Sequence, residues 1–133
     1  MRIILTILLF CFTTLDFFSQ SESHTDEQIY LRVDEPAEFP GGSNEMFLFL
    51  AKNMQYPAVA IENGIEGRVY VKFVVNKSGT VSDVAIERGI PNCPECAEES
   101  LRIVRAMPAW KPAKISGQPV NYLLYLPIKF QLK

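Results

Sequence analysis

The sequence predicts an α+β domain of two layers, in which a small antiparallel three-stranded sheet carries helices on one face. Three patterns indicate this class: two alternating apolar segments joined by a short turn, a helix with one apolar side, and a long alternating segment near the end of the chain. A chain of 133 residues with 48% apolar residues suits a single domain with a core that needs no metal.

The first 21 residues have the three parts of a secretory signal peptide. Arg2 supplies the positive start, an apolar stretch follows, and Ser19-Gln20-Ser21 offers a small-x-small cleavage site. Asp16 ends the apolar stretch short of the about 20 residues that a membrane span needs, which favours cleavage over an inner-membrane anchor. We expect residues 1–21 to be a signal peptide, 22–36 a flexible lead-in and 37–133 the domain.

The first half of the domain reads as two helices separated by a Tyr-Pro pair. Gly41-Gly42 predicts a turn, after which Ser43 is expected to cap a helix whose apolar residues, from Met46 to Met54, predict deep burial. Tyr56 and Pro57 then lead into a short helix from 58 to 63, and Gly64 suits its end. Gly67 opens the following strand.

The next two segments read as a β-hairpin. Residues 68–76 alternate, with Val69, Val71 and Phe73 on one side, and the loop that ends at Gly79 precedes a return strand over 80–87. The alternation slips near Ser82-Asp83, which predicts a β-bulge.

A third helix and a last strand complete the expected order. Cys93 and Pro94 suit the N-cap and the first position of an amphipathic helix. Residues 107–119, with Trp110 and Pro112, read as a loop. Residues 121–132 alternate again, and Pro127 within them predicts an edge strand.

Few residues of this chain suit catalysis. The single histidine, His24, lies outside the expected domain, so a Ser-His or Cys-His site has no base there. A net charge of −2 gives no reason to expect nucleic-acid binding. Cys93 and Cys96 supply only two of the four ligands that zinc needs, so we expect no metal and no cofactor. Export favours a structural disulfide between them, and the alternative is a thiol-disulfide protein that uses this pair.

The phrases together resemble the C-terminal domain of the TonB family, in the versions common in Bacteroidetes-like bacteria. The resemblance is carried in family order by "FPGG" at 39–42, "YP" at 56–57, "GIEGRVYVKFVVNKSGTV" at 64–81, "MPAWKPA" at 107–113, "GQPV" at 117–120 and "LPIKF" at 126–130. It thus spans nearly all of the expected domain.

The resemblance implies a periplasmic, non-enzymatic module that binds the TonB box of outer-membrane receptors and so supports energy-coupled transport. It implies contact with the ExbB/ExbD motor only if the N-terminus is an uncleaved anchor facing the periplasm. The alternatives are the thiol-disulfide protein and an accessory envelope module that binds another partner or forms a homodimer.

The same resemblance points to the last strand as the place of docking, by strand addition to its free edge. The expected partner-binding residues are Tyr122, Leu123, Leu124, Tyr125, Leu126 and Lys129. Leu123, Tyr125 and Lys129 are expected to point outward and to tune selectivity, whereas Tyr122, Leu124 and Leu126 are expected to point inward.

Overall fold

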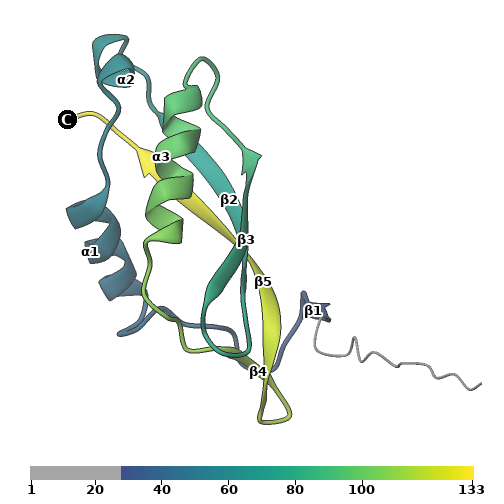
Figure 1. The fold of residues 1–133 in the computed structure, drawn as a ribbon. Helices are drawn as coiled ribbons and strands as arrows, with labels where there is room; N and C mark the ends of the chain where they lie inside the picture. The colour runs from purple at the N-terminus through teal and green to yellow at the C-terminus, as the bar shows by residue number, and fades with distance from the viewer. Residues whose placement is uncertain (1–27) are drawn as a thin grey trace, which may run out of the picture.

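The computed structural model describes residues 28–133, and the predicted signal peptide lies outside this range. The described residues form three helices and five strands (Figure 1). The helices are α1 (Ser43–Asn53), α2 (Ala58–Glu62) and α3 (Pro94–Arg105). The strands are β1 (Ile29–Tyr30), β2 (Gly67–Val75), β3 (Val81–Arg88), β4 (Ala113–Ile115) and β5 (Gln118–Phe130).

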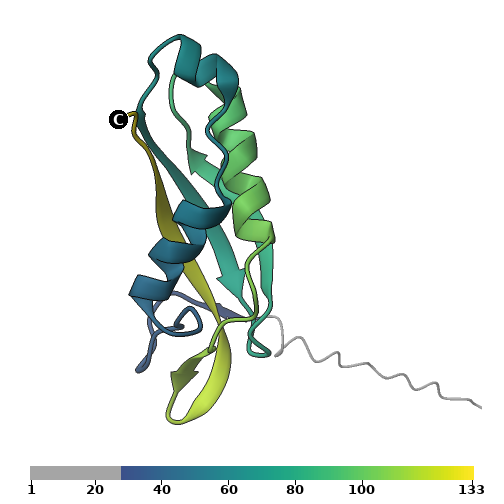
Figure 2. The ribbon, with the colours of Figure 1, turned by 90° about the vertical axis from the view of Figure 1, so that its left-hand side faces the viewer.

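The sheet has the strand order β1-β5-β2-β3, and β2 forms antiparallel pairs with both β5 and β3. Figure 2 shows α1 and α3 on the same face of this sheet. Because one face is covered, the alternating residues of β2 divide as expected, and Val69, Val71 and Phe73 are fully buried against the helices. The predicted α+β class, with an antiparallel core of three strands and helices on one face, is confirmed.

The β2–β3 pair contains the predicted bulge. Lys72 lies opposite Ala85 while Val74 lies opposite Ser82, so β3 has one residue more than β2 over this stretch. Asp83 takes up the extra length with a φ of 52°. The phase slip in the sequence therefore located a real irregularity in the ladder.

Helix α3 follows its sequence pattern closely. Pro94 occupies the first turn, and the Cys93 sulfur accepts a hydrogen bond from the backbone N–H of Cys96. Ile103 and Val104 are fully buried, and the basic residues of the last turn favour the negative end of the helix. This helix contacts β3 and β2.

Two expectations for α1 were wrong. Gly42, not Ser43, stands at the N-cap, and no side chain caps the helix. No residue of α1 is buried, and Phe47 and Leu48 are each 60% exposed. The physical reason is position, because α1 touches the core only along one side, with residues such as Met46, and its opposite side is exposed. An apolar composition predicts burial only where a second element lies opposite.

Two short strands were not predicted. Residues 107–119 were expected to be a loop, but β4 pairs with the start of β5 through a tight turn in which Ser116 and Gly117 have φ values of 51° and 79°. The lead-in, expected to be flexible, is described from Gln28 onward. There it forms β1, which pairs in parallel with β5, and Glu35 forms a bridge with Lys114.

Candidate docking edge

One side of β5 is largely without a partner strand. Its inner side pairs with β2 along nine residues, from Tyr122 to Phe130. On its outer side, β1 pairs only at Asn121 and Tyr122. Among the described residues, no strand lies beside the outer side of β5 from Leu123 to Phe130. This stretch therefore presents backbone N–H and C=O groups to whatever approaches.

Pro127 fits this geometry. It lies opposite Tyr70 in the β2 ladder, and it has no N–H to donate. A proline inside a sheet is tolerated where its nitrogen faces away from the paired neighbour, which here means the outer edge of β5. The sequence-based expectation of an edge strand therefore agrees with the observed topology.

The expected partner-binding residues alternate along this edge. Leu126 is buried and Leu124 half-buried on the face covered by helices, whereas Tyr125 and Lys129 are exposed on the other face. Leu123 is half-buried. Tyr122 differs from the others, because its outer neighbour is Tyr30 of β1. The structure thus brings five of the six positions to the unpaired stretch and places the sixth at its boundary.

The Tyr56-Pro57 phrase fixes the far end of β5. The Tyr56 hydroxyl donates a hydrogen bond to the Ile65 carbonyl, and its ring meets the Phe130 ring edge-on at 5.5 Å. Burial and the nearby Glu66 carboxylate raise the pKa of Tyr56. Glu66 in turn accepts a hydrogen bond of 2.9 Å from the backbone N–H of Leu132. Residues 56–66 therefore hold the end of the edge strand in place.

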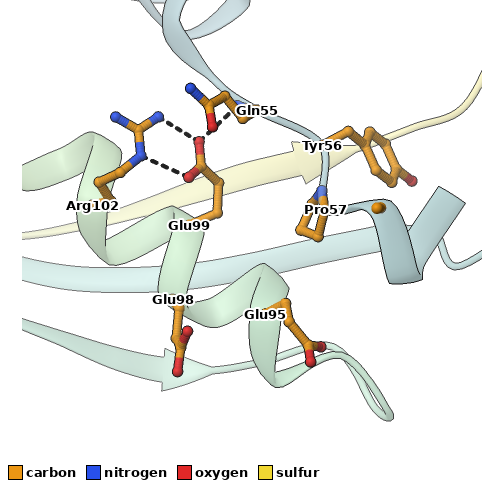
Figure 3. Close-up of a pocket in the computed structure, with 8 residues that line it drawn as sticks. Gln55, Tyr56, Pro57, Glu95, Glu98, Glu99 and Arg102 are labelled. Atoms are coloured by element: carbon orange, nitrogen blue, oxygen red, sulfur yellow. Dashed lines mark hydrogen bonds and ion pairs between the residues drawn. The ribbon is translucent and has the colours of Figure 1, made fainter.

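A charged cluster joins α3 to the segment between α1 and α2 (Figure 3). The Glu99 carboxylate accepts hydrogen bonds of 2.7 Å from the Gln55 backbone N–H and from Arg102 Nε, and a second Arg102 nitrogen lies at 2.6 Å. Arg102 also donates to the Asn53 carbonyl. Burial alone would raise the pKa of Glu99, but these hydrogen bonds and the Arg102 charge outweigh it and lower that pKa.

This cluster is a structural connection that the sequence analysis missed. The open depression around it, of about 500 Å³, is also lined by Glu95 and Glu98, which point away from the Glu99–Arg102 pair in Figure 3. The spacing of three residues between Glu99 and Arg102 was the available signal. Nothing in the sequence indicated that the backbone N–H of Gln55 would donate a hydrogen bond to Glu99.

Trp110 is central to the core next to the edge. Its indole is only 7% exposed and meets the rings of Phe39 and Phe73 at 5.6 and 5.7 Å, both edge-on. Its backbone N–H donates to the carbonyl of Gly79 at 2.8 Å, which ties the β2–β3 turn to the segment after α3. Pro112 then leads into β4. Trp110 therefore packs the segment after α3 against β2 and against the segment that precedes α1.

The cysteine pair does not offer a reactive site. Cys93 and Cys96 are joined in a disulfide, and they are only 1% and 0% exposed. Thiol-disulfide exchange needs an attacking thiolate to reach a sulfur atom, and burial at both positions prevents that approach. The thiol-disulfide alternative is therefore disfavoured, and the bridge is best understood as a clamp at the start of α3.

The fold defines a class of protein, a small α+β domain whose last strand leaves a sheet edge largely unpaired. Within residues 28–133, no three His, Cys, Asp or Glu side chains gather as metal ligands would. In the same range, no helix is both long and apolar enough to cross a lipid bilayer.

Comparison with known proteins identifies the family. The family model described as "Gram-negative bacterial TonB protein C-terminal" matches residues 52–132, which is more than half of the chain, so the protein belongs to this family. The expected resemblance is thereby confirmed, and it indicates a TonB-like module of the bacterial envelope. No curated protein sequence matches the chain.

Solved structures similar to this chain include two of one bacterial protein. Both are solution NMR structures of the C-terminal domain of Helicobacter pylori TonB, in a longer and a shorter form. The longer form shares 27% identity at a TM-score of 0.49, with 71% of this chain and 87% of that chain covered. The shorter form shares 25% identity at a TM-score of 0.45, with 68% and 92% covered.

Proposed function

We propose that this domain is a periplasmic, non-enzymatic module that docks the TonB box of an outer-membrane TonB-dependent transporter. Docking occurs by strand addition to the outer side of β5, and it supports energy-coupled transport across the outer membrane. The observation that carries the proposal is the unpaired stretch from Leu123 to Phe130, beside which no strand lies in the described part of the chain.

Main-chain hydrogen bonds at a sheet edge can form with partner strands of many different sequences. Each backbone hydrogen bond contributes about 1 kcal/mol net, so an added strand gains affinity mainly from its main chain. Side chains then adjust selectivity, and the outward Tyr125 and Lys129, both exposed, are the contacts on the open face. A receptor segment of varied sequence is therefore accommodated, provided that it is extended.

The edge is also pre-formed, which lowers the cost of binding. β5 is held along its inner side by β2 and at its far end by Tyr56 and Glu66. A partner therefore orders only its own segment, and the sheet loses little further conformational entropy. β1 sets the near limit of the site, because it already occupies the outer side at Asn121 and Tyr122.

Site-directed crosslinking tests this proposal. Single cysteines replace Leu123, Tyr125 or Lys129, and each protein is incubated with a cysteine scan of a receptor-box peptide. We expect disulfide crosslinks in an alternating register, because side chains of paired strands face each other at every second residue. The native disulfide is buried and does not compete.

Single cysteines at Asp83 and Glu87, both exposed on β3 at the opposite edge, provide the matched control. Crosslinks confined to this control edge, or none at either edge, would show that β5 is not the docking strand. Crosslinks between two copies of the protein through β5, with none to the peptide, would instead identify the edge as a dimer interface.

A further inference from the structure

A cavity opens next to the unpaired stretch of β5. It has a volume of about 210 Å³ and lies between β5 and the segment that leads into α1. Its walls are mainly apolar and include Ala37, Phe39, Met46, Trp110, Leu124 and Leu126. Two members of the proposed docking edge, Leu124 and Leu126, are thus also walls of this cavity.

The cavity is lined by residues of β5 and by none of β2. Phe73 and Val71 of β2 stand opposite Leu124 and Leu126 in the sheet, yet neither lines the cavity. The remaining walls come from residues 37–46 and from Trp110. The space therefore borders β5 rather than β2, on the face of the sheet that carries Leu124 and Leu126.

An exposed aromatic residue, Phe47, lies on the same side of α1 as a residue that lines the cavity. Ser43 and Met46 line the cavity, and Phe47 follows Ser43 by four residues, so both lie on one side of the helix. Leu48, equally exposed at 60%, lies on the other side, where it lines a separate depression with Pro108. Phe47 is therefore an exposed apolar side chain on the side of α1 that carries Ser43.

We propose that this cavity is a specificity pocket that takes one large apolar side chain, leucine, methionine or phenylalanine, from the strand docked on β5. The proposal rests on strand addition as the function of the edge. Adjacent strands lie about 4.8 Å apart and alternate their side chains. A docked residue that faces inward beside Leu124 and Leu126 therefore points into the cavity.

The chemistry of the walls limits the choice of side chain. The volume exceeds what an alanine methyl would fill, and the walls offer mostly carbon atoms. The one charged residue at the cavity is Glu38, which disfavours an acidic side chain there. The pocket therefore selects a large neutral apolar residue at one inward position of the docked strand. The main-chain hydrogen bonds do not depend on the sequence of that strand.

Two peptides test the pocket. Both are blocked at their ends and read Ser-Thr-Val-X-Val-Thr-Ser, with leucine or alanine at X. Trp110 is the single tryptophan of the chain, so its fluorescence reports on the cavity without labelling. Binding is measured by calorimetry and by this fluorescence. We expect the leucine peptide to bind about tenfold more tightly and to change the Trp110 emission more than the alanine peptide does.

Variants of the protein localise the effect. Ala37→Phe fills the cavity from its wall, and we expect the preference for leucine over alanine to disappear. Phe47→Ala is expected to weaken the leucine peptide severalfold, whereas Leu48→Ala, its equally exposed neighbour, should not. A leucine preference that survives Ala37→Phe in a folded protein, or equal losses in the two α1 variants, would overturn the pocket.

The outcomes separate the pocket from the docking function. If both peptides bind equally and protect the β5 backbone from hydrogen exchange, strand addition stands and the pocket is refuted. If neither peptide binds and no crosslink forms on β5, the docking function fails and the pocket fails with it. The pair Phe47→Ala and Leu48→Ala decides the question should Ala37→Phe not fold.

Discussion

Replacing Gly79 by alanine should destabilise the fold strongly, for two reasons that the structure separates. Gly79 has a φ of +95°, a conformation that residues with a Cβ adopt only at a cost. A Cβ at this position would also overlap the carbonyl oxygen of Trp110, which is backbone and cannot swing aside. The same contact carries the hydrogen bond from the Trp110 N–H to the Gly79 carbonyl.

The magnitude follows from the two effects. The positive φ costs about 1–2 kcal/mol, and a steric overlap in packed surroundings adds about 1–3 kcal/mol. We therefore expect Gly79→Ala to lower the free energy of unfolding by about 3 kcal/mol. Gly64 has a φ of +63° with open space around it, so Gly64→Ala should show only the first effect, about 1 kcal/mol.

Gly89 completes the series as a neutral control. It lies outside the positive-φ region, and a methyl group added there would meet no other atom within 4 Å, so Gly89→Ala should be neutral or slightly stabilising. Urea unfolding, with the disulfide intact, measures all three free energies. A loss below about 1 kcal/mol for Gly79→Ala, or a loss equal to that of Gly64→Ala, would refute the close contact with Trp110.

Three further predictions concern other parts of the chain. Because the pKa of Glu99 is lowered in the fold, its contribution is present above the ordinary carboxyl value of 4.5 and is lost as the pH falls below it. Glu99→Gln should therefore cost about 1 kcal/mol at pH 7 and less at pH 3 in urea unfolding, and an equal cost at both pH values would contradict this. Cys93 and Cys96 should resist alkylation in protein kept oxidised, and two labelled thiols by mass spectrometry would disprove the bridge. The mature protein from the native host should begin near Glu22, and an intact N-terminus in the membrane fraction would show that the leader is retained.

The long elements were predictable because their patterns repeat. β2, β3, α3 and β5 each contain enough residues for a period of two or of about 3.6 to be seen, and their order followed directly. Even the bulge at Asp83 left a visible slip. β1 and β4 span only two and three residues, so they carry no period, and their pairing with β5 arises from tertiary contact.

Helix α1 shows the limit of composition as a guide. Its run of apolar residues predicted deep burial, but what decides burial is the neighbouring surface, which one chain segment does not reveal. Likewise, Gly79 was recognised as a turn glycine, while the strictness of its requirement comes from Trp110, distant in the sequence. Pro127 was the exception, because a proline within a strand pattern constrains its surroundings as well as itself.

The edge of β5 is unpaired over most of its length, yet it contains features that oppose pairing between two copies of this chain. These features favour a foreign strand over a second copy. Long apolar edges aggregate unless charges, proline or neighbouring segments interrupt them. Here Pro127 removes one donor, Lys129 adds a charge, and β1 covers the positions of Asn121 and Tyr122. A second copy that pairs through the same edge would bring Lys129 and Pro127 of both chains into one short ladder. A foreign strand would meet one proline and one lysine in this ladder rather than two of each, so its penalty would be smaller.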